Sequence, residues 1–162
     1  MDTPLKSRPS SGATPAPGRR QRTAILGSLT IPGRPAEVSG ARAFIARTLT
    51  ASGKRPTVDL DAATLLTSEL VTNAIVHTAS GAPGGTVTVV VVDVPDGVLI
   101  EVIDDGSAAT PVVKGELLAT DGHGLFLVQQ LTAQWGYLRD AAGTTVWFHL
   151  APAPPGRGEL GR

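Results

Sequence analysis

Two strand-like runs separated by a tight turn constrain the fold of this chain more than any other feature. The runs TVTVVVVDV (86–94) and VLIEVID (98–104) are rich in β-branched residues, which favour strands. The segment Pro95-Asp96-Gly97 between them is typical of a hairpin turn. Aromatic residues make up only 4% of the chain, so its core has to be aliphatic. We therefore expect an antiparallel hairpin within an aliphatic sheet that helices cover.

The rest of the middle of the chain alternates between patterns typical of strands and of helices. The expected elements are a strand over 23–31, helices opening at 35, at about 60 and at 122–124, and strands over 135–139 and 144–150. Gly53 ends the first helix, and Asp59 is placed to cap the second, which ends near Thr78. Helices grouped with a mixed, mostly antiparallel sheet make an α+β two-layer sandwich.

The two ends of the chain differ in composition from its middle. Residues 1–22 are rich in Pro, Ser and Gly and carry five basic residues against one acidic residue. They and residues 151–162 have too little apolar surface to offset the entropy of ordering, so we expect both to be disordered. Residues 23–150 should form one domain, with twelve acidic and seven basic residues. Because nucleic-acid binding needs a basic face, we expect no direct nucleic-acid partner.

Neither cysteine chemistry nor a membrane span is expected. The 162-residue chain has no Cys, which excludes disulfides and thiolate metal sites. Its longest apolar stretch, residues 87–92, is too short to cross a bilayer, and the first twenty residues lack the apolar run of a secretory signal. We expect a cytoplasmic protein that does not associate with membranes.

Glu69, Asn73 and His77 recur every four positions in the second expected helix and so share one face. The apolar residues that flank this row are Leu65, Leu66 and Val76. Polar groups buried among apolar ones are costly unless something polar meets them, and a magnesium ion with phosphate oxygens would do so. Asn73 offers a carbonyl oxygen suited to Mg²⁺, and Glu69 offers a base one turn earlier. The spacing fits an ordinary amphipathic helix with polar rim residues equally well.

Two strand ends carry polar residues beside glycines. Asp104 ends the second strand of the hairpin, and Gly106 follows it closely. A carboxylate at the mouth of a sheet can accept the exocyclic amine of an adenine, and a glycine lets the base approach the backbone. Thr144 follows Gly143, and its hydroxyl can bond a base directly or through water. Taken singly, both segments also fit plain turns.

A glycine pair at the start of the third expected helix offers another place for a ligand. Gly122 and Gly124 leave backbone N–H groups free where the helix dipole favours phosphate. The dinucleotide fingerprint is excluded because Leu127 stands where a third glycine is required, and the chain has no P-loop. A capped helix start without a ligand fits this segment too, and His123 fits either a phosphate contact or a loop position.

The order and spacing of these motifs resemble the Bergerat ATP-binding fold of the gyrase, histidine-kinase and MutL-type ATPases. Within that superfamily the chain is more similar to stand-alone bacterial anti-sigma regulatory factors of the serine/threonine-kinase type. The segments that carry the resemblance are SELVTNAIVH (68–77), Asp104-x-Gly106, GLFLV (124–128) and GTTVW (143–147). The resemblance covers residues 23–150 and implies a sheet with helices on one face.

The resemblance also implies a role for each matching residue. Glu69 would be the general base and Asn73 the Mg²⁺ ligand, while Asp104 would hold the adenine amine. The residues implied to contact ATP are Asn73, His77, Asp104, Gly106, Gly122, His123, Gly124, Leu125 and Thr144. Ala108 replaces a family glycine and His123 stands where Arg is common. These two departures bear on catalysis more than on ATP binding.

The activity that the resemblance implies is that of an ATP-dependent serine/threonine kinase. Such a kinase phosphorylates a small anti-sigma antagonist protein and regulates transcription through a sigma factor. The alternative is a binding module in which ATP or ADP sets the affinity for a protein partner without phosphoryl transfer. A plain ATP hydrolase is a third interpretation, but nothing in so short a chain would convert hydrolysis into work. Relatives suggest a homodimer.

Overall fold

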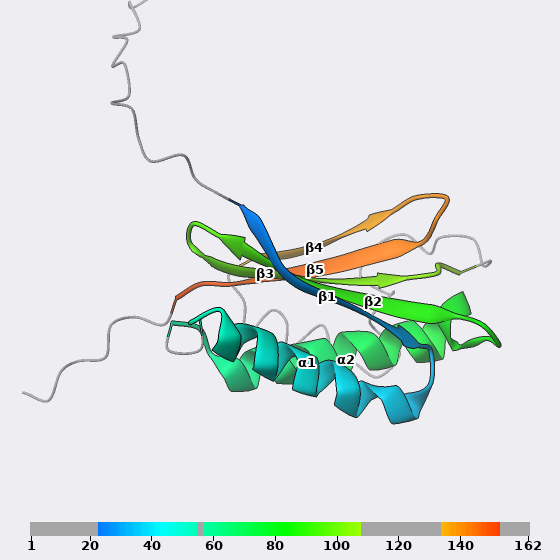
Figure 1. The fold of residues 1–162 in the computed structure, drawn as a ribbon. Coiled ribbons are helices and arrows are strands. Elements are labelled where there is room, and N and C mark those ends of the chain that lie inside the picture. Colours follow the sequence, from blue (N-terminus) through cyan, green and yellow to red (C-terminus); the bar gives the residue numbers. More distant parts are fainter. Residues whose placement is uncertain (1–22, 55–56, 108–133, 153–162) are drawn as a thin grey trace, which may run out of the picture.

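The computed structural model describes residues 23–54, 57–107 and 134–152 (Figure 1). Its elements in chain order are β1 (Ala24–Pro32), η1 (Pro35–Glu37), α1 (Val38–Ala51), α2 (Leu60–His77), η2 (Ala79–Gly81), β2 (Thr86–Val94), β3 (Gly97–Asp104), β4 (Gln134–Arg139) and β5 (Thr144–Leu150). The expected strands and the first two helices are therefore confirmed to within a few residues. The helix expected at 122–124 lies outside the described residues.

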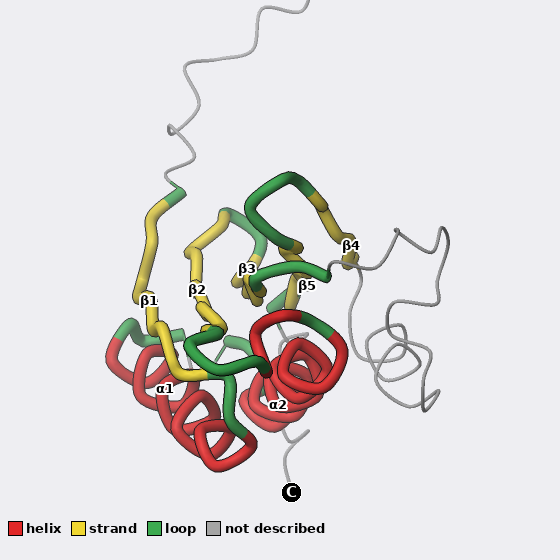
Figure 2. The backbone as a smooth tube through the Cα atoms, turned by 90° about the vertical axis from the view of Figure 1, so that its right-hand side faces the viewer, coloured by secondary structure: helices red, strands yellow, loops and turns green. Residues whose placement is uncertain are grey.

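The five strands form one sheet in the order β1-β2-β3-β5-β4. Each neighbouring pair is antiparallel, so the described part of the sheet contains none of the parallel pairing that a mixed sheet allows. Both α-helices lie on the same face of the sheet, which confirms the α+β two-layer arrangement (Figures 1 and 2). No helix in the described part of the chain is long and apolar enough to cross a membrane.

The hairpin of β2 and β3 forms at the expected turn. Val94 pairs with Gly97, which leaves Pro95 and Asp96 as the two turn residues. Gly97 has a φ of +133°, and a Cβ there would overlap the carbonyl oxygen of Leu150 on β5. A glycine is thus required both by the turn and by the close approach of the neighbouring strand.

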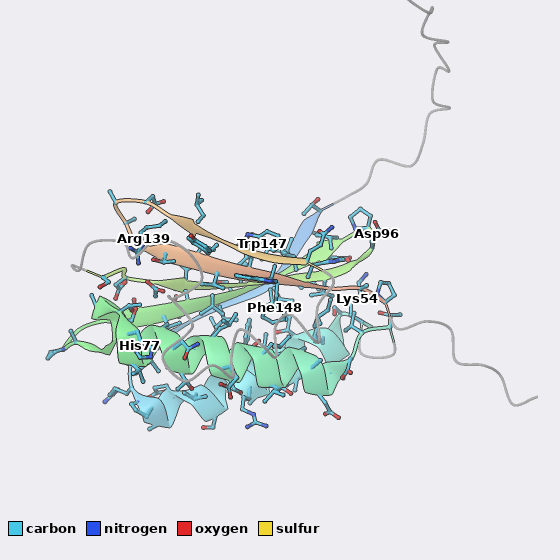
Figure 3. All side chains as sticks on the ribbon, turned by 180° about the vertical axis from the view of Figure 1, so that it is seen from behind. Lys54, His77, Asp96, Arg139, Trp147 and Phe148 are labelled. Carbon is cyan, nitrogen blue, oxygen red and sulfur yellow. The ribbon has the colours of Figure 1, made fainter. Side chains whose placement is uncertain are left out.

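The core lies between the sheet and the two helices and is aliphatic, as the composition predicts. Alternate residues of the strands point toward the helices, and the other residues face away. The side chains that are completely buried there include Ile45, Leu49, Leu66, Val71, Val87, Val89, Val91, Ile100 and Phe148. Phe148 and Trp147 are neighbours on β5 and lie on opposite faces of the sheet (Figure 3). Helix α2 is capped as expected, because the Asp59 carboxylate accepts a hydrogen bond from Ala62 N at 3.0 Å.

Candidate functional site

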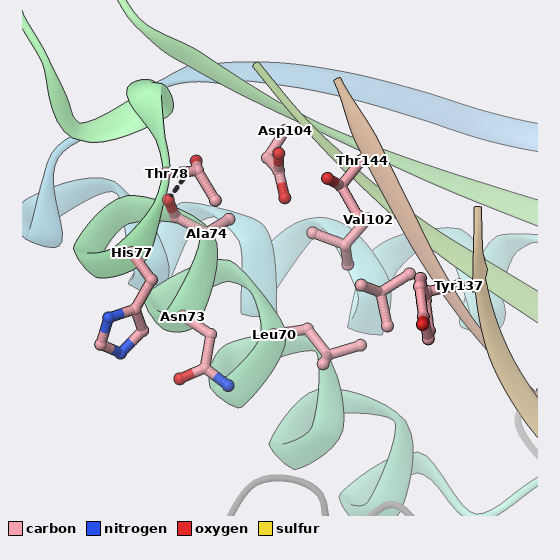
Figure 4. Close-up of a pocket in the computed structure, with 10 residues that line it drawn as sticks. Leu70, Asn73, Ala74, His77, Thr78, Val102, Asp104, Tyr137 and Thr144 are labelled. Atoms are coloured by element: carbon pink, nitrogen blue, oxygen red, sulfur yellow. Dashed lines mark hydrogen bonds between the residues drawn. The ribbon is translucent and has the colours of Figure 1, made fainter. Parts of the chain in front are cut away.

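Four of the residues singled out in the sequence border a single pocket (Figure 4). Asn73 and His77 come from the last turns of α2, Asp104 from the end of β3 and Thr144 from the start of β5. The pocket has about 450 Å³ of empty space, including its open mouth. Its other lining residues are Leu70, Ala74, Thr78, Val102, Tyr137 and Val146. A mostly apolar pocket with a few convergent polar groups is typical of a small-molecule site.

Asp104 is the most buried ionisable residue of this pocket, with only 7% of its surface exposed. Its Oδ1 accepts a hydrogen bond from Gly106 N at 2.7 Å. Burial raises the pKa of the carboxyl group, while hydrogen bonds from the backbone of Gly106 and Thr144 and the charge of Arg139 act in the opposite direction. A carboxylate held in this way is a fixed hydrogen-bond acceptor at the inner end of the pocket.

Two glycines allow the backbone beside Asp104 to pack closely. Gly106 has a φ of +76°, and a Cβ there would lie 3.1 Å from the Cα of Gly143. A Cβ on Gly143 would overlap the carbonyl oxygen of Asp104. The segment after β3 and the turn before β5 therefore touch backbone to backbone. Gly106 borders an adjoining hollow, with Arg139 and Asp105, rather than the pocket that Asp104 lines.

A set of hydrogen bonds fixes the end of α2 against the end of β3. The Thr78 hydroxyl accepts from Ser80 N at 3.1 Å, and the completely buried Ser80 accepts from Asp105 N at 2.8 Å. Ala79 N also donates to Gly106 O at 2.6 Å. These bonds hold the helix that carries Asn73 at a set distance from the strand that carries Asp104. These bonds could not be predicted from the sequence, because each joins residues that are distant in sequence or lie in a loop.

The polar row on α2 is less buried than its sequence pattern indicated. Glu69, Asn73 and His77 are all half-buried. Of the apolar residues that flank the row, Leu66 is completely buried, but Leu65 is 38% exposed and Val76 is 62% exposed. The expectation of a buried row was therefore wrong. The reason is that α1 packs against one side of α2 and the sheet against another, so these elements cover only part of the circumference of the helix (Figure 2).

Not all of the predicted site residues border the pocket. Glu69 does not border the pocket, although it lies one helical turn before Asn73, which does. The phosphate-contacting residues expected from the sequence, together with the substitution at position 108, lie outside the described residues: Gly122, His123, Gly124, Leu125 and Ala108. Their predicted roles stay predictions.

Two residues of β4 take part in the site without having been predicted. Tyr137 borders the pocket and is 48% exposed, and it pairs with Val146 of β5. Arg139 pairs with Thr144, and its Nε donates to the Thr144 hydroxyl at 3.3 Å. Both residues fall on the helix-facing side of β4, because they pair with Val146 and Thr144, which border the pocket on that side. Alternation along residues 135–139, combined with the pairing to β5, is the signal that would have identified them.

The polar groups of the pocket suit a metal ion that binds together with the phosphates of a ligand better than an ion that is held by protein groups alone. Within the described ranges, no group of three His, Asp or Glu residues is placed to hold a metal ion. Mg²⁺ usually binds through one or two protein oxygens together with substrate phosphates and water. The amide oxygen of Asn73, at the rim of the pocket, fits that pattern (Figure 4).

The chain is similar to known proteins over most of its length. A family model described as a histidine kinase-like ATPase domain matches residues 31–150. Among solved structures, the crystal structure of the RsbU and RsbW domains of Rv1364c from Mycobacterium tuberculosis has a similar fold, with a TM-score of 0.54 and 23% identity. The match covers 79% of this chain and 33% of that one, so this chain spans about a third of its length. No curated protein matches the chain in sequence.

Proposed function

Because the chain belongs to the histidine kinase-like ATPase domain family, we propose that its pocket binds ATP together with Mg²⁺ and that it is a protein serine/threonine kinase. The observation that carries the proposal is the convergence of Asn73, Asp104 and Thr144 on one apolar pocket. Asp104 supplies an acceptor, Thr144 a hydroxyl and Asn73 an amide oxygen. These are the groups that an adenine edge and a magnesium ion require.

The adenine lies at the inner end of the pocket. Its exocyclic amine donates to the Asp104 carboxylate, which is buried and already held by Gly106 N. Apolar walls from Leu70 and Val102 enclose the ring faces, and the Tyr137 ring closes the side toward β4. An amine that replaces water on a buried carboxylate makes a charge-assisted hydrogen bond, which is about twice as strong as a neutral one.

The phosphates extend from this pocket past Asn73 toward Glu69. When bound, Mg²⁺ neutralises charge on the phosphates, and the Asn73 amide oxygen is the protein atom that would hold it. Glu69, one turn away, accepts the proton of a serine or threonine hydroxyl. The hydroxyl oxygen bonds to the γ-phosphorus as the bond to the β–γ bridging oxygen breaks, and ADP leaves. Half-exposure suits this role, because a protein substrate has to reach Glu69.

A small antagonist protein is the proposed substrate, and control of a sigma factor is the proposed outcome. The similarity of residues 68–77 to the corresponding segment of anti-sigma regulatory factors supports this assignment. A homodimer is proposed on the same ground.

A second candidate function rests on the position of Glu69. Because Glu69 does not border the pocket, the same site also suits a module that binds ATP or ADP and changes its affinity for a partner without phosphoryl transfer. The two functions differ only in whether the γ-phosphate leaves ATP, so one experiment separates them.

The deciding experiment measures transfer of the labelled γ-phosphate from ATP to antagonist-like proteins encoded beside this chain. In the kinase, Glu69→Gln lowers the rate of transfer at least about a hundredfold, the low end of the effect of a general base. The affinity of the variant for ADP, measured by calorimetry, stays within about twofold of the wild type. Asp61→Asn is the matched control, since Asp61 is an exposed carboxylate on the same helix, and it should keep full transfer.

Other results would decide against the kinase. If the wild type transfers no phosphate while ATP still changes partner binding, the protein is a binding module. If neither ATP nor ADP binds the wild type, the assignment of the pocket is wrong.

A further inference from the structure

We propose that Arg139 is a positioning residue that sets the direction of the Thr144 hydroxyl, and that this lets the pocket select adenine over bases that carry an N1–H. The inference deepens the proposed function and rests on it. It concerns which base enters the pocket, a property separate from phosphoryl transfer.

The geometry begins with the pairing of β4 and β5. Arg139 is the last residue of β4 and lies opposite Thr144, the first residue of β5. Its Nε donates to the Thr144 Oγ1 at 3.3 Å. A guanidinium has donors and no acceptor, so the hydroxyl oxygen is the accepting partner in this bond. The single hydroxyl proton of Thr144 is therefore directed away from Arg139.

The Thr144 hydroxyl lies in a confined space. Thr144 is only 2% exposed and borders the pocket. In β3 and β5 the residues Asp104 and Thr144 are paired directly across the two strands. Figure 4 shows their side chains next to each other at the inner end of the pocket. The Asp104 carboxylate, an acceptor, and the Thr144 hydroxyl, a donor, thus lie side by side on one wall of the pocket.

Adenine presents the complementary pair on its Watson–Crick edge. The exocyclic N6 amine is a donor, and the adjacent N1 is an acceptor. Guanine and hypoxanthine reverse both groups, because they carry an oxygen at position 6 and a hydrogen on N1. With its oxygen accepting from Arg139, the Thr144 hydroxyl meets N1 as a donor, whereas an N1–H would face the hydroxyl proton and an oxygen at position 6 would face the Asp104 carboxylate. The positive charge of Arg139 also favours the ionised, acceptor-only form of Asp104.

The test compares the binding of ADP and 1-deaza-ADP, in which a C–H group replaces N1 and the amine is kept. For the wild type we expect 1-deaza-ADP to bind about tenfold more weakly, because the buried hydroxyl proton loses its acceptor. In Arg139→Met the hydroxyl is free to turn to another partner, so the ratio of the two dissociation constants should fall to about two or three. Thr144→Val removes the hydroxyl and should bring the ratio close to one.

Further variants separate positioning from a general loss of structure. Arg139→Lys keeps a charge and a donor and should restore part of the wild-type ratio. The matched control is Leu138→Ala, the neighbouring residue of β4, which faces away from the helices and is 65% exposed. It should leave the ratio unchanged. In the Thr144→Val background, Arg139→Met should have no further effect on the ratio, since the two residues act through one bond.

Two outcomes overturn the inference and are easily told apart. If ADP binds the wild type normally but Arg139→Met leaves the ratio at its wild-type value, Arg139 does not orient the hydroxyl, and the proposed function is unaffected. If the wild type binds no adenine nucleotide, both the proposed function and this inference fail.

Discussion

Asp104 combines a buried position with a charge, a combination that disfavours folding unless the charge is paired and hydrogen-bonded. The residue is 7% exposed, and the pocket that it lines is bordered on the other side by α2. Two backbone N–H groups offset part of the cost of burial. The rest of the cost remains in the ligand-free protein and is relieved when an amine donates to the carboxylate. The residue is thus better suited to binding than to stability.

The cost of burying Asp104 predicts a pH dependence. Burial raises the pKa of the folded carboxyl above its ordinary value of 3.8. The folded state then keeps this proton to higher pH than the unfolded state, so the wild type loses stability as the pH rises from 3.8 through the raised pKa. Asp104→Asn cannot ionise at this position, so its stability relative to the wild type should increase as the pH rises through that window. Above the window the difference in unfolding free energy should stay constant. Urea unfolding of both proteins, without nucleotide, at several pH values from acid to neutral measures this.

The difference between the two proteins is what tests the assignment, because all other titrating groups cancel in it. A difference that stays constant with pH, or that shrinks as the pH rises, would contradict a raised pKa for Asp104.

The contact of Gly143 with Asp104 predicts a site-specific loss of stability. In Gly143→Ala the added methyl group overlaps the Asp104 carbonyl oxygen, so the turn before β5 has to move away from the end of β3. We expect a loss of about 2 kcal/mol of unfolding free energy, in the range for overpacking, and weaker ADP binding. Gly40→Ala is the control, because no atom lies within 4 Å of its Cβ position in α1. It should stabilise the protein by about 0.5–1 kcal/mol, as expected for Ala in a helix. A Gly143→Ala variant as stable as the wild type would refute the close contact.

At the scale of secondary-structure elements, the sequence predicted those features that depend on residues close together in the chain. The β2–β3 hairpin followed from β-branched runs and a turn, and α2 followed from its apolar stripe and its Asp59 cap. The strand order could not be predicted, because pairing partners that are distant in sequence determine it. For the same reason the exposure of Val76 was misjudged, since it depends on what lies beside the helix. The contribution of Arg139 also required the pairing of β4 with β5.

The cap of α2 offers a prediction at this scale. The Asp59 carboxylate accepts from Ala62 N, so Asp59→Ala leaves a helix-end N–H without its side-chain partner. We expect it to lower the free energy of unfolding by about 1 kcal/mol. ADP affinity should not change, because the cap is at the opposite end of α2 from Asn73 and His77. Urea unfolding and calorimetry on the same samples check both parts.

The neighbouring carboxylate is the control for the cap. Asp61 lies in the first turn of α2 and makes no capping bond to a helix-end N–H, so Asp61→Ala should lose only about 0.3 kcal/mol from the helix dipole. Equal losses in the two variants would show that charge, rather than the capping bond, stabilises this helix end.

At the scale of the whole molecule, the two ends of the layered structure are held differently. The end with the pocket is joined by hydrogen bonds, from Asp105 N to the Ser80 hydroxyl and from Ala79 N to Gly106 O. The other end carries an ion pair between Lys54 after α1 and Asp93 of β2, at 2.6 Å. The aliphatic core lies between them. A ligand in the pocket therefore bridges the helix layer and the sheet at an end where polar contacts join them, and its binding should stabilise the fold as a whole.

This bridging predicts how nucleotide and magnesium share the stabilisation. Any ligand that binds only the folded state adds about 2.7 kcal/mol when present at a hundred times its dissociation constant. When a chelator removes Mg²⁺, ADP should stabilise the wild type and Asn73→Ala equally, because both proteins keep Asp104 and Thr144, the residues that contact the adenine. Adding Mg²⁺ should stabilise the wild type further but not Asn73→Ala, since only the wild type offers the amide oxygen to the ion. Thr72→Ala, an exposed neighbour on α2, should respond to Mg²⁺ like the wild type. If Asn73→Ala gained the full magnesium increment in urea unfolding, another part of the chain would have to hold the ion, and the link between α2 and the phosphates would be lost.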